Sequence, residues 1–287
     1  MSEEKGEYIV NAPATIQEPP EAYHANPALS FTEFKRFMVS PLEYRAYRDQ
    51  PADSAALSFG RLAHCLALEP EKFGERYAVL PDIDRRTKAG KEAYARFVAE
   101  NAGMEIIKSG DYELAARIGE AARKRLPAGG IIEGTIRGKT EFGELQCRPD
   151  LIANDGTLWD LKTTASVAGF ERQAFSLQYH YQDAFYRYVI QRASGKLPDP
   201  ISFVASEKRV PNDTIVRRFG PDLYAFLVRK IEAALARYAE CVKTDTWPGM
   251  DADGEVREMV TPAWVENEIG GSDVPLDIDA LFGAGGE

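Results

Sequence analysis

The chain has 287 residues, of which 44% are hydrophobic, so it can form one large domain or two small ones with a substantial core. The formal net charge of −10 argues against a protein coated in basic surface for nucleic acid, but positive charge can still be held inside a cleft or channel. The three cysteines form no C-x-x-C pair, so neither a zinc site nor a disulfide framework is expected.

The two ends of the chain differ in composition from its middle. Residues 1–28 hold several prolines and acids and are expected to form an irregular N-terminal arm, whereas residues 29–265 are expected to form the folded domain. Residues 266–287 are predicted to be an acidic, Gly-rich tail, in which Leu276–Phe282 could dock on another protein. No segment resembles a signal peptide or reaches membrane-spanning length, so a cytoplasmic protein without membrane contact is expected.

The first predicted helix begins at Ser30. Glu33 follows three residues later, which is the spacing of a capping box, and Phe34 and Phe37 share one apolar face. Pro41 is expected to end this helix. A later helix over residues 57–68 is small and apolar on nearly every side and is expected to be buried.

His64 lies near the middle of that apolar helix. A lone histidine in such a helix is usually a hydrogen-bonded core residue, but if the helix packs against the hairpin predicted over residues 147–164, His64 could be a metal ligand. A basic cluster follows, and it either forms a solvated face or contacts DNA phosphates. Its members are Arg85, Arg86, Lys88 and Lys91.

A helix over residues 111–126 and a strand over residues 131–136 lead towards the centre of the chain. Glu133 falls inside that strand. If Glu133 is buried it needs a metal or a cation as partner, and otherwise it faces outward on an edge strand.

The stretch from Cys147 to Thr164 predicts a β-hairpin, with Asn154-Asp155-Gly156 as its turn. Side chains alternate along a strand, so Asp160 and Lys162 point the same way, and Asp150 lies across the hairpin. Two carboxylates beside an ammonium are suited to holding Mg²⁺ next to a phosphate. The alternative is a surface salt bridge, because D-x-K triplets are common in a chain with 28% charged residues.

One long helix is predicted over residues 170–192. Gln182 and Tyr186 are four residues apart and share a face, which is either aimed at the active site or part of an aromatic core. A strand over residues 201–206 and a helix over residues 221–244 complete the predicted elements.

Several motifs in this order resemble the nuclease domain of the exonuclease VIII (RecE) family, a branch of the PD-(D/E)xK superfamily. The resemblance covers roughly residues 20 to 265. The motifs are Ala22-Tyr23-His24, Ser40-Pro41, Gly60-Arg61-Leu62-Ala63-His64-Cys65, Leu68-Glu69-Pro70-Glu71, Arg85–Glu92, Cys147-Arg148-Pro149-Asp150, Asp160-Leu161-Lys162-Thr163-Thr164, Tyr179–Tyr186 and Thr246-Trp247-Pro248.

The resemblance implies an α/β fold with a PD-(D/E)xK nuclease-like mixed central sheet flanked by helices, and it assigns roles to single residues. Asp150 and Asp160 would bind metal and Lys162 would be the catalytic lysine. The further implied roles are metal binding by His64 and by the carbonyl of Leu161, a Q-x-x-x-Y motif at Gln182 and Tyr186, and an acid near the site at Glu133. Arg85, Arg86 and Arg148 are weaker candidates for DNA contacts.

The implied activity is a Mg²⁺-dependent 5′-to-3′ exodeoxyribonuclease, with Mn²⁺ as a substitute, which degrades one strand of linear double-stranded DNA to leave 3′ tails for recombination. Implied partners are DNA ends, further copies of the chain in a ring-shaped tetramer, and a phage-type single-strand annealing protein. A structure-specific endonuclease and a catalytically silent DNA-binding module remain as alternatives.

Overall fold

The computed structural model describes residues 14–50 and 55–261. By its internal contacts the chain divides into a unit of residues 1–249, which holds the helices and strands named below, and a unit of residues 250–287. Within the second unit, the Arg257 guanidinium pairs with the Asp251 carboxylate at 2.5 Å. The predicted acidic tail and its docking segment lie outside the described residues.

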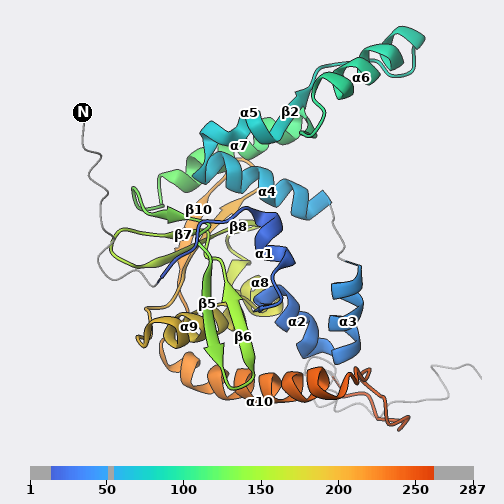
Figure 1. Ribbon diagram of the computed structural model, residues 1–287. Helices are drawn as coiled ribbons and strands as arrows, with labels where there is room; N and C mark the ends of the chain where they lie inside the picture. The colour runs from blue at the N-terminus through green and yellow to red at the C-terminus, as the bar shows by residue number, and fades with distance from the viewer. Residues whose placement is uncertain (1–13, 51–54, 262–287) are drawn as a thin grey trace, which may run out of the picture. The chain divides into compact units, whose positions relative to one another are not determined.

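The first unit contains both helices and strands, with β4 to β8 in succession near its middle (Figure 1). In chain order they are α1 (Pro20–Ala25), β1 (Leu29–Ser30), α2 (Phe31–Val39), α3 (Pro41–Asp49), α4 (Ala55–Leu68), a 3₁₀ turn (Pro70–Lys72), α5 (Phe73–Arg76), β2 (Tyr77–Leu80), α6 (Lys88–Glu100), β3 (Glu105–Lys108), α7 (Ser109–Arg123), β4 (Ile131–Ile132), β5 (Ile136–Thr140), β6 (Gly143–Cys147), β7 (Leu151–Ile152), β8 (Leu158–Thr164), α8 (Phe170–Ser176), α9 (Tyr179–Ser194), β9 (Ser202–Glu207), β10 (Thr214–Arg217) and α10 (Asp222–Thr244). Among the described helices, none is both long and apolar enough to cross a lipid bilayer.

The strands form three sheets. The largest has the order β10-β9-β8-β7-β4, in which β8 and β9 are parallel and the other neighbours are antiparallel. A second sheet has the order β1-β6-β5, and β2 and β3 form a parallel pair. The fold is therefore mixed α/β with helices against mixed sheets, as the sequence predicts.

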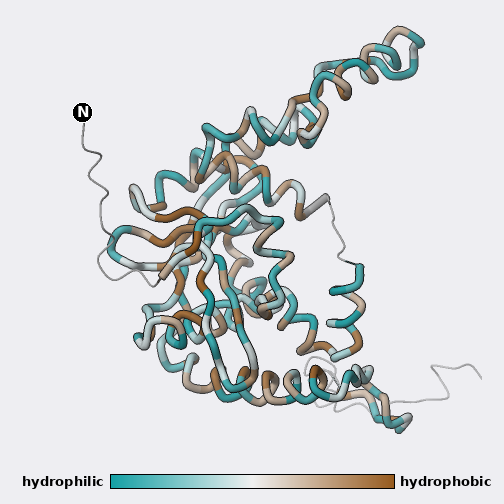
Figure 2. Tube along the Cα trace, viewed as in Figure 1, coloured by the Kyte–Doolittle hydropathy of each residue, from teal (hydrophilic) through white to brown (hydrophobic). Residues whose placement is uncertain are grey.

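The two faces of β8 meet different helices, and this decides where the polar residues of β8 point. Leu161 packs with Ala67 of α4 and Ala122 of α7. Because side chains alternate along a strand, Asp160 and Lys162 lie on the opposite face, which α9 covers. Figure 2 shows hydrophobic residues along the central strands, whereas hydrophilic and apolar residues alternate along α6.

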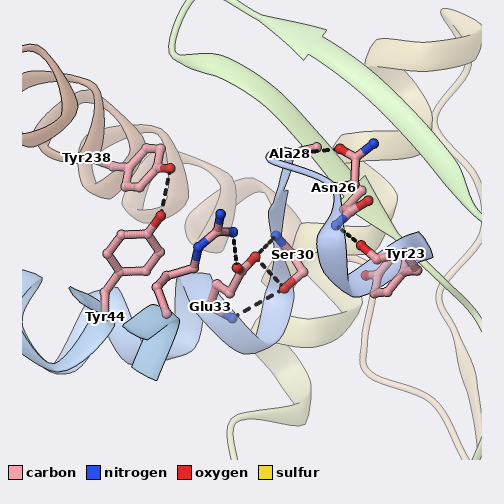
Figure 3. Close-up of polar contacts among 9 residues, drawn as sticks. Tyr23, Asn26, Ala28, Ser30, Glu33, Tyr44 and Tyr238 are labelled. Atoms are coloured by element: carbon pink, nitrogen blue, oxygen red, sulfur yellow. Dashed lines mark hydrogen bonds and ion pairs between the residues drawn. The ribbon is translucent and has the colours of Figure 1, made fainter. Parts of the chain in front are cut away.

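The predicted start of α2 is confirmed (Figure 3). Ser30 and Glu33 form the capping box, in which the Glu33 carboxylate accepts from the Ser30 amide at 2.8 Å and from its hydroxyl at 2.7 Å. Arg48 also pairs with Glu33. The hydroxyls of Tyr44 and Tyr238 lie 3.0 Å apart and link α3 to α10. These contacts join α2, α3 and α10 to one another.

The prediction of one helix over residues 170–192 is wrong, because two helices, α8 and α9, occupy this stretch. Gln178 lies between them with a left-handed backbone (φ 64°), which a continuous helix cannot include. The carbonyl of Leu177, left without a helical partner, accepts from Lys35 Nζ at 3.0 Å.

The predicted strand over residues 131–136 is also interrupted. Glu133 has a positive φ of 49°, so β4 ends before it and β5 begins at Ile136. Between them Thr135 pairs with Ile16, whose amide donates to the Thr135 carbonyl at 2.8 Å. The chain changes sheets at this point, because β4 belongs to the five-stranded sheet and β5 to the sheet of β1, β6 and β5.

Two expectations about packing need correction. Residues 1–28 are not irregular throughout, because α1 lies within them. The Tyr23 side chain is buried, and the Tyr23 carbonyl accepts a hydrogen bond from Gln146 Nε2 at 3.0 Å. The helix α4 is exposed at its start, where Leu57 is 55% exposed, whereas residues 62–68 are all buried or partly buried. The prediction of a buried helix therefore holds for the second half of α4 only.

Candidate active site

The predicted hairpin is present and positions its acids. Leu151 pairs with Trp159 and Ile152 with Leu158, so β7 and β8 are joined by the expected turn. Gly156 has a φ of 84° in that turn, a conformation that favours glycine. Asp150 therefore stands at the start of β7, beside the middle of β8.

Asp150 is held by the backbone of the neighbouring strand. Its Oδ2 accepts from the amide of Leu161 at 2.6 Å, and His64 Nδ1 lies 3.5 Å from the same oxygen. Burial raises the pKa of Asp150 to about 6, the negative charge of Asp160 adds to the rise, and His64 and Lys162 oppose it. The carboxylate is thus costly to keep charged without a further cation.

Asp160 is 2% exposed and has partners on both carboxylate oxygens. Gln182 Nε2 donates to Oδ2 at 2.7 Å, and Lys162 Nζ lies 2.5 Å from Oδ1. Burial alone would lower the pKa of Lys162, but the charges of Asp160 and Asp150 outweigh it and the pKa is raised. Lys162 is therefore held as an ammonium, with the Tyr179 ring 4.6 Å away.

His64 and the carbonyl of Leu161, two predicted metal ligands, meet each other. The imidazole Nε2 lies 2.8 Å from the Leu161 oxygen. The helix α4 does pack against the hairpin, which is the condition under which His64 was expected to join the site. A nitrogen, a carbonyl and two carboxylates converge here.

These donor types fit a hard divalent cation such as Mg²⁺, and a cation would offset the charge of two buried acids. In the arrangement described, however, no three His, Cys, Asp or Glu side chains within residues 14–50 and 55–261 already surround a metal-sized point. Asp160 faces Lys162 and Gln182, and His64 faces a carbonyl. The residues fit the ion by chemistry, and their side chains must turn to bind it.

Glu133 and Arg148 form an ion pair with each other, and among the described ion pairs neither is joined to Asp150 or Asp160. Arg148 Nη2 donates to Glu133 Oε2 at 2.8 Å, while the Glu133 amide donates to the Asp150 carbonyl at 3.0 Å. Tyr186 donates its hydroxyl to the Arg148 carbonyl at 3.4 Å, and burial holds its pKa far above the ordinary value. Tyr186 therefore supports the backbone that leads into Asp150.

The structure does not bring Arg85 and Arg86 to the hairpin. Both precede α6, which projects away from β7 and β8 in Figure 1. Arg86 pairs with Asp84 at 2.8 Å, and the guanidinium of Arg85 lies 4.8 Å from the Tyr94 ring. Arg85 and Arg86 therefore remain candidates only for contacts to a DNA segment long enough to reach beyond the hairpin.

Sequence reasoning missed Lys35 of α2. Burial lowers its pKa, and the charges of Arg36 and Lys162 lower it further. Its ammonium reaches the break between α8 and α9. No sequence signal marks it, because a lysine between apolar helix positions usually faces solvent.

Three comparisons with known proteins bear on this site. The family model described as "PDDEXK-like domain of unknown function (DUF3799)" matches residues 30–256. A crystal structure of a protein from Eubacterium rectale, named "Putative exonuclease", superposes with a TM-score of 0.58 at 15% identity, over 94% of this chain and 99% of that one. At this identity the likeness concerns the fold. No curated protein matches the chain.

Proposed function

This chain belongs to the family of PDDEXK-like domains of unknown function (DUF3799), and from that premise we propose that it is a metal-dependent nuclease. One observation carries the proposal: Asp150, Asp160 and Lys162 converge on one hairpin, with Asp160 buried and held by both Lys162 and Gln182. A surface salt bridge would not need a buried acid with this many partners.

Each residue has a role that follows from its contacts. A divalent ion on Asp150, Asp160, His64 and the carbonyl of Leu161 would supply a Lewis acid that activates water and offsets charge on the scissile phosphate. Lys162, kept protonated by the two acids, would stabilise that charge and is poorly suited to accept a proton.

Gln182 and Tyr186 act one step away from the reaction. Gln182 fixes the plane of the Asp160 carboxylate, and Tyr186 holds the strand before Asp150. Arg148 would have to leave Glu133 to reach a phosphate, whereas Lys35 has no carboxylate partner among the ion pairs of the described residues and donates only to the Leu177 carbonyl among the hydrogen bonds described there. Lys35 is thus the better candidate for a contact to the neighbouring phosphate.

We extend the proposal to a Mg²⁺-dependent 5′-to-3′ exonuclease on linear double-stranded DNA that leaves 3′ tails for strand annealing. Support comes from the resemblance to the RecE nuclease domains and from the fold shared with the Eubacterium rectale protein named as an exonuclease. A ring of four copies would reconcile the net charge of −10 with DNA binding, because only the channel needs positive charge. Light scattering that gives the mass of one chain would contradict the ring.

An annealing protein is the proposed partner, and the tail after Glu266 is its proposed contact. Deletion of residues 267–287 should weaken that binding in a pull-down with a phage-type annealing protein. Unchanged binding would exclude the tail.

The test is digestion of linear duplex DNA labelled at the 5′ or the 3′ end, with Mg²⁺ or EDTA. A closed circular duplex runs beside it, together with Asp160→Asn and the hairpin-turn control Asp155→Asn. We expect early metal-dependent loss of the 5′ label, an intact circle, an inactive Asp160→Asn protein and an active control. A cut circle would indicate an endonuclease, and no cleavage with any divalent metal would indicate a silent binding module.

A further inference from the structure

A cavity of about 300 Å³ lies between α8, β9 and the segment that joins β10 to α10. Its lining includes four phenylalanines, Phe170, Phe175, Phe203 and Phe219. Phe170 and Phe203 are buried behind the others, so Phe175 and Phe219 supply the accessible ring surface. Small-molecule sites begin at about this size and combine apolar walls with a few polar groups. The size and lining suit one flat aromatic group.

The rings leave apolar surface open at the mouth of this aromatic pocket. Phe175 and Phe219 meet edge-to-face, with centroids 5.4 Å apart, and Phe203 and Phe219 do the same at 5.6 Å. Phe175 is nevertheless 52% exposed, and Leu177 beside it is 37% exposed. Exposed apolar residues gathered at one place, in contrast to scattered ones, mark a binding surface.

The aromatic pocket shares a wall with the candidate active site. Phe203 pairs in register with Asp160 across β8 and β9. The Lys162 ammonium lies 6.0 Å from the Phe203 ring and 4.6 Å from that of Tyr179, which stacks on Phe203 at 5.8 Å. A strand with one phosphate at Lys162 would therefore have its neighbouring nucleotide close to the pocket.

Two arginines belong to the lining of this pocket. Arg217 donates to Glu171 at 2.9 Å and is largely neutralised by it. The Arg218 guanidinium donates to the Ser202 hydroxyl at 2.6 Å and lies 6.0 Å from the Trp159 ring. Ser202 and Trp159 pair in register one residue before Phe203 and Asp160, so this guanidinium lies on the face of the sheet opposite to Phe203. The pocket itself therefore offers apolar contact, which suits a base, and the neighbouring phosphate would lie at Lys162.

We propose that the aromatic pocket binds one unpaired nucleobase of the DNA strand being cut, next to a phosphate at Lys162. This inference rests on the proposed nuclease function and adds a substrate subsite to it. Stacking on aromatic side chains accepts every base, which suits an enzyme that removes nucleotides regardless of sequence. Drawing one base into the pocket would separate the strand from its complement beside Lys162.

The test uses the full chain with thymidine 5′-monophosphate in EDTA, followed by saturation-transfer NMR and titration. We expect the strongest transfer at the thymine methyl and ring protons. Phe175→Ala should weaken binding by about 5-fold or more, the lower end for loss of one stacked base. Phe226→Ala is the matched control, because Phe226 is 51% exposed but lies on α10 outside the pocket lining, and it should bind as wild type does.

Absent transfer to thymine at millimolar nucleotide, or equal weakening in the Phe175 and Phe226 variants, would overturn the inference. The same wild-type preparation is tested on linear duplex with Mg²⁺. Digestion without nucleotide binding would reject the pocket and keep the nuclease, whereas Phe175-dependent binding without digestion would support the pocket and reject the nuclease.

Discussion

Replacing Asp150 by asparagine should stabilise the metal-free protein at alkaline pH. Burial raises the pKa of this carboxyl from its ordinary 3.8 to about 6, so the folded state binds its proton more tightly than the unfolded state does. The stability that this group contributes is therefore present below about pH 4 and lost as the pH rises through about 6. The difference corresponds to about 3 kcal/mol of unfolding free energy.

Asp150→Asn keeps an oxygen that can accept from the Leu161 amide and removes the charge. We expect a gain of about 1–3 kcal/mol over wild type at pH 8 in EDTA, and little difference at pH 4. Urea unfolding followed by tryptophan fluorescence at both pH values measures it. Asp155→Asn is the control, and it should lower the unfolding free energy at pH 8. Thr157 donates to that exposed carboxylate and lowers its pKa, so the charged form of Asp155 favours the folded state.

An Asp150→Asn protein less stable than wild type at pH 8 would refute the reasoning. It would mean that the contacts of the carboxylate with His64 and Lys162 outweigh its burial. A gain that is equal at both pH values would also count against it, since the effect must follow the titration of this one carboxyl.

Three further predictions follow from the same geometry. Ser30→Ala removes the N-cap of α2 and should lower the unfolding free energy by about 1–2 kcal/mol, measured by urea; no loss would deny the cap its role. Gly138→Ala would place a Cβ 2.6 Å from the Val189 carbonyl of α9 and should cost about 1–3 kcal/mol by overpacking, whereas Gly220→Ala meets nothing within 4 Å and should cost less. Mg²⁺ affinity, measured by calorimetry, should fall by up to about tenfold per pH unit below about 6, because the ion must displace the proton of Asp150; a constant affinity from pH 8 to 5 would contradict this.

Local patterns in the sequence were sufficient for the features that depend on neighbours in the chain. The capping box at Ser30, the hairpin turn before Thr157 and the shared face of Asp160 and Lys162 all follow from spacing, and the structure has each of them. The mixed α/β fold followed from the ordered motifs. These features need only the period of a strand or helix and the chemistry of a turn.

Tertiary contacts decided the rest. The break at Gln178 lies beside a contact with Lys35, and the chain changes sheets near Glu133, where Thr135 pairs with Ile16. These partners lie far away in the sequence, so no local pattern could show them. Pairing of Glu133 with Arg148 likewise required the folded chain.

The same holds for the charge states of the site. Whether Lys162 stays protonated depends on the carboxylates of Asp160 and Asp150, which the fold brings close to it. The sequence by itself determined which residues can do the chemistry. Only the tertiary structure decided their partners, because burial and charge act through distance in space and not along the chain.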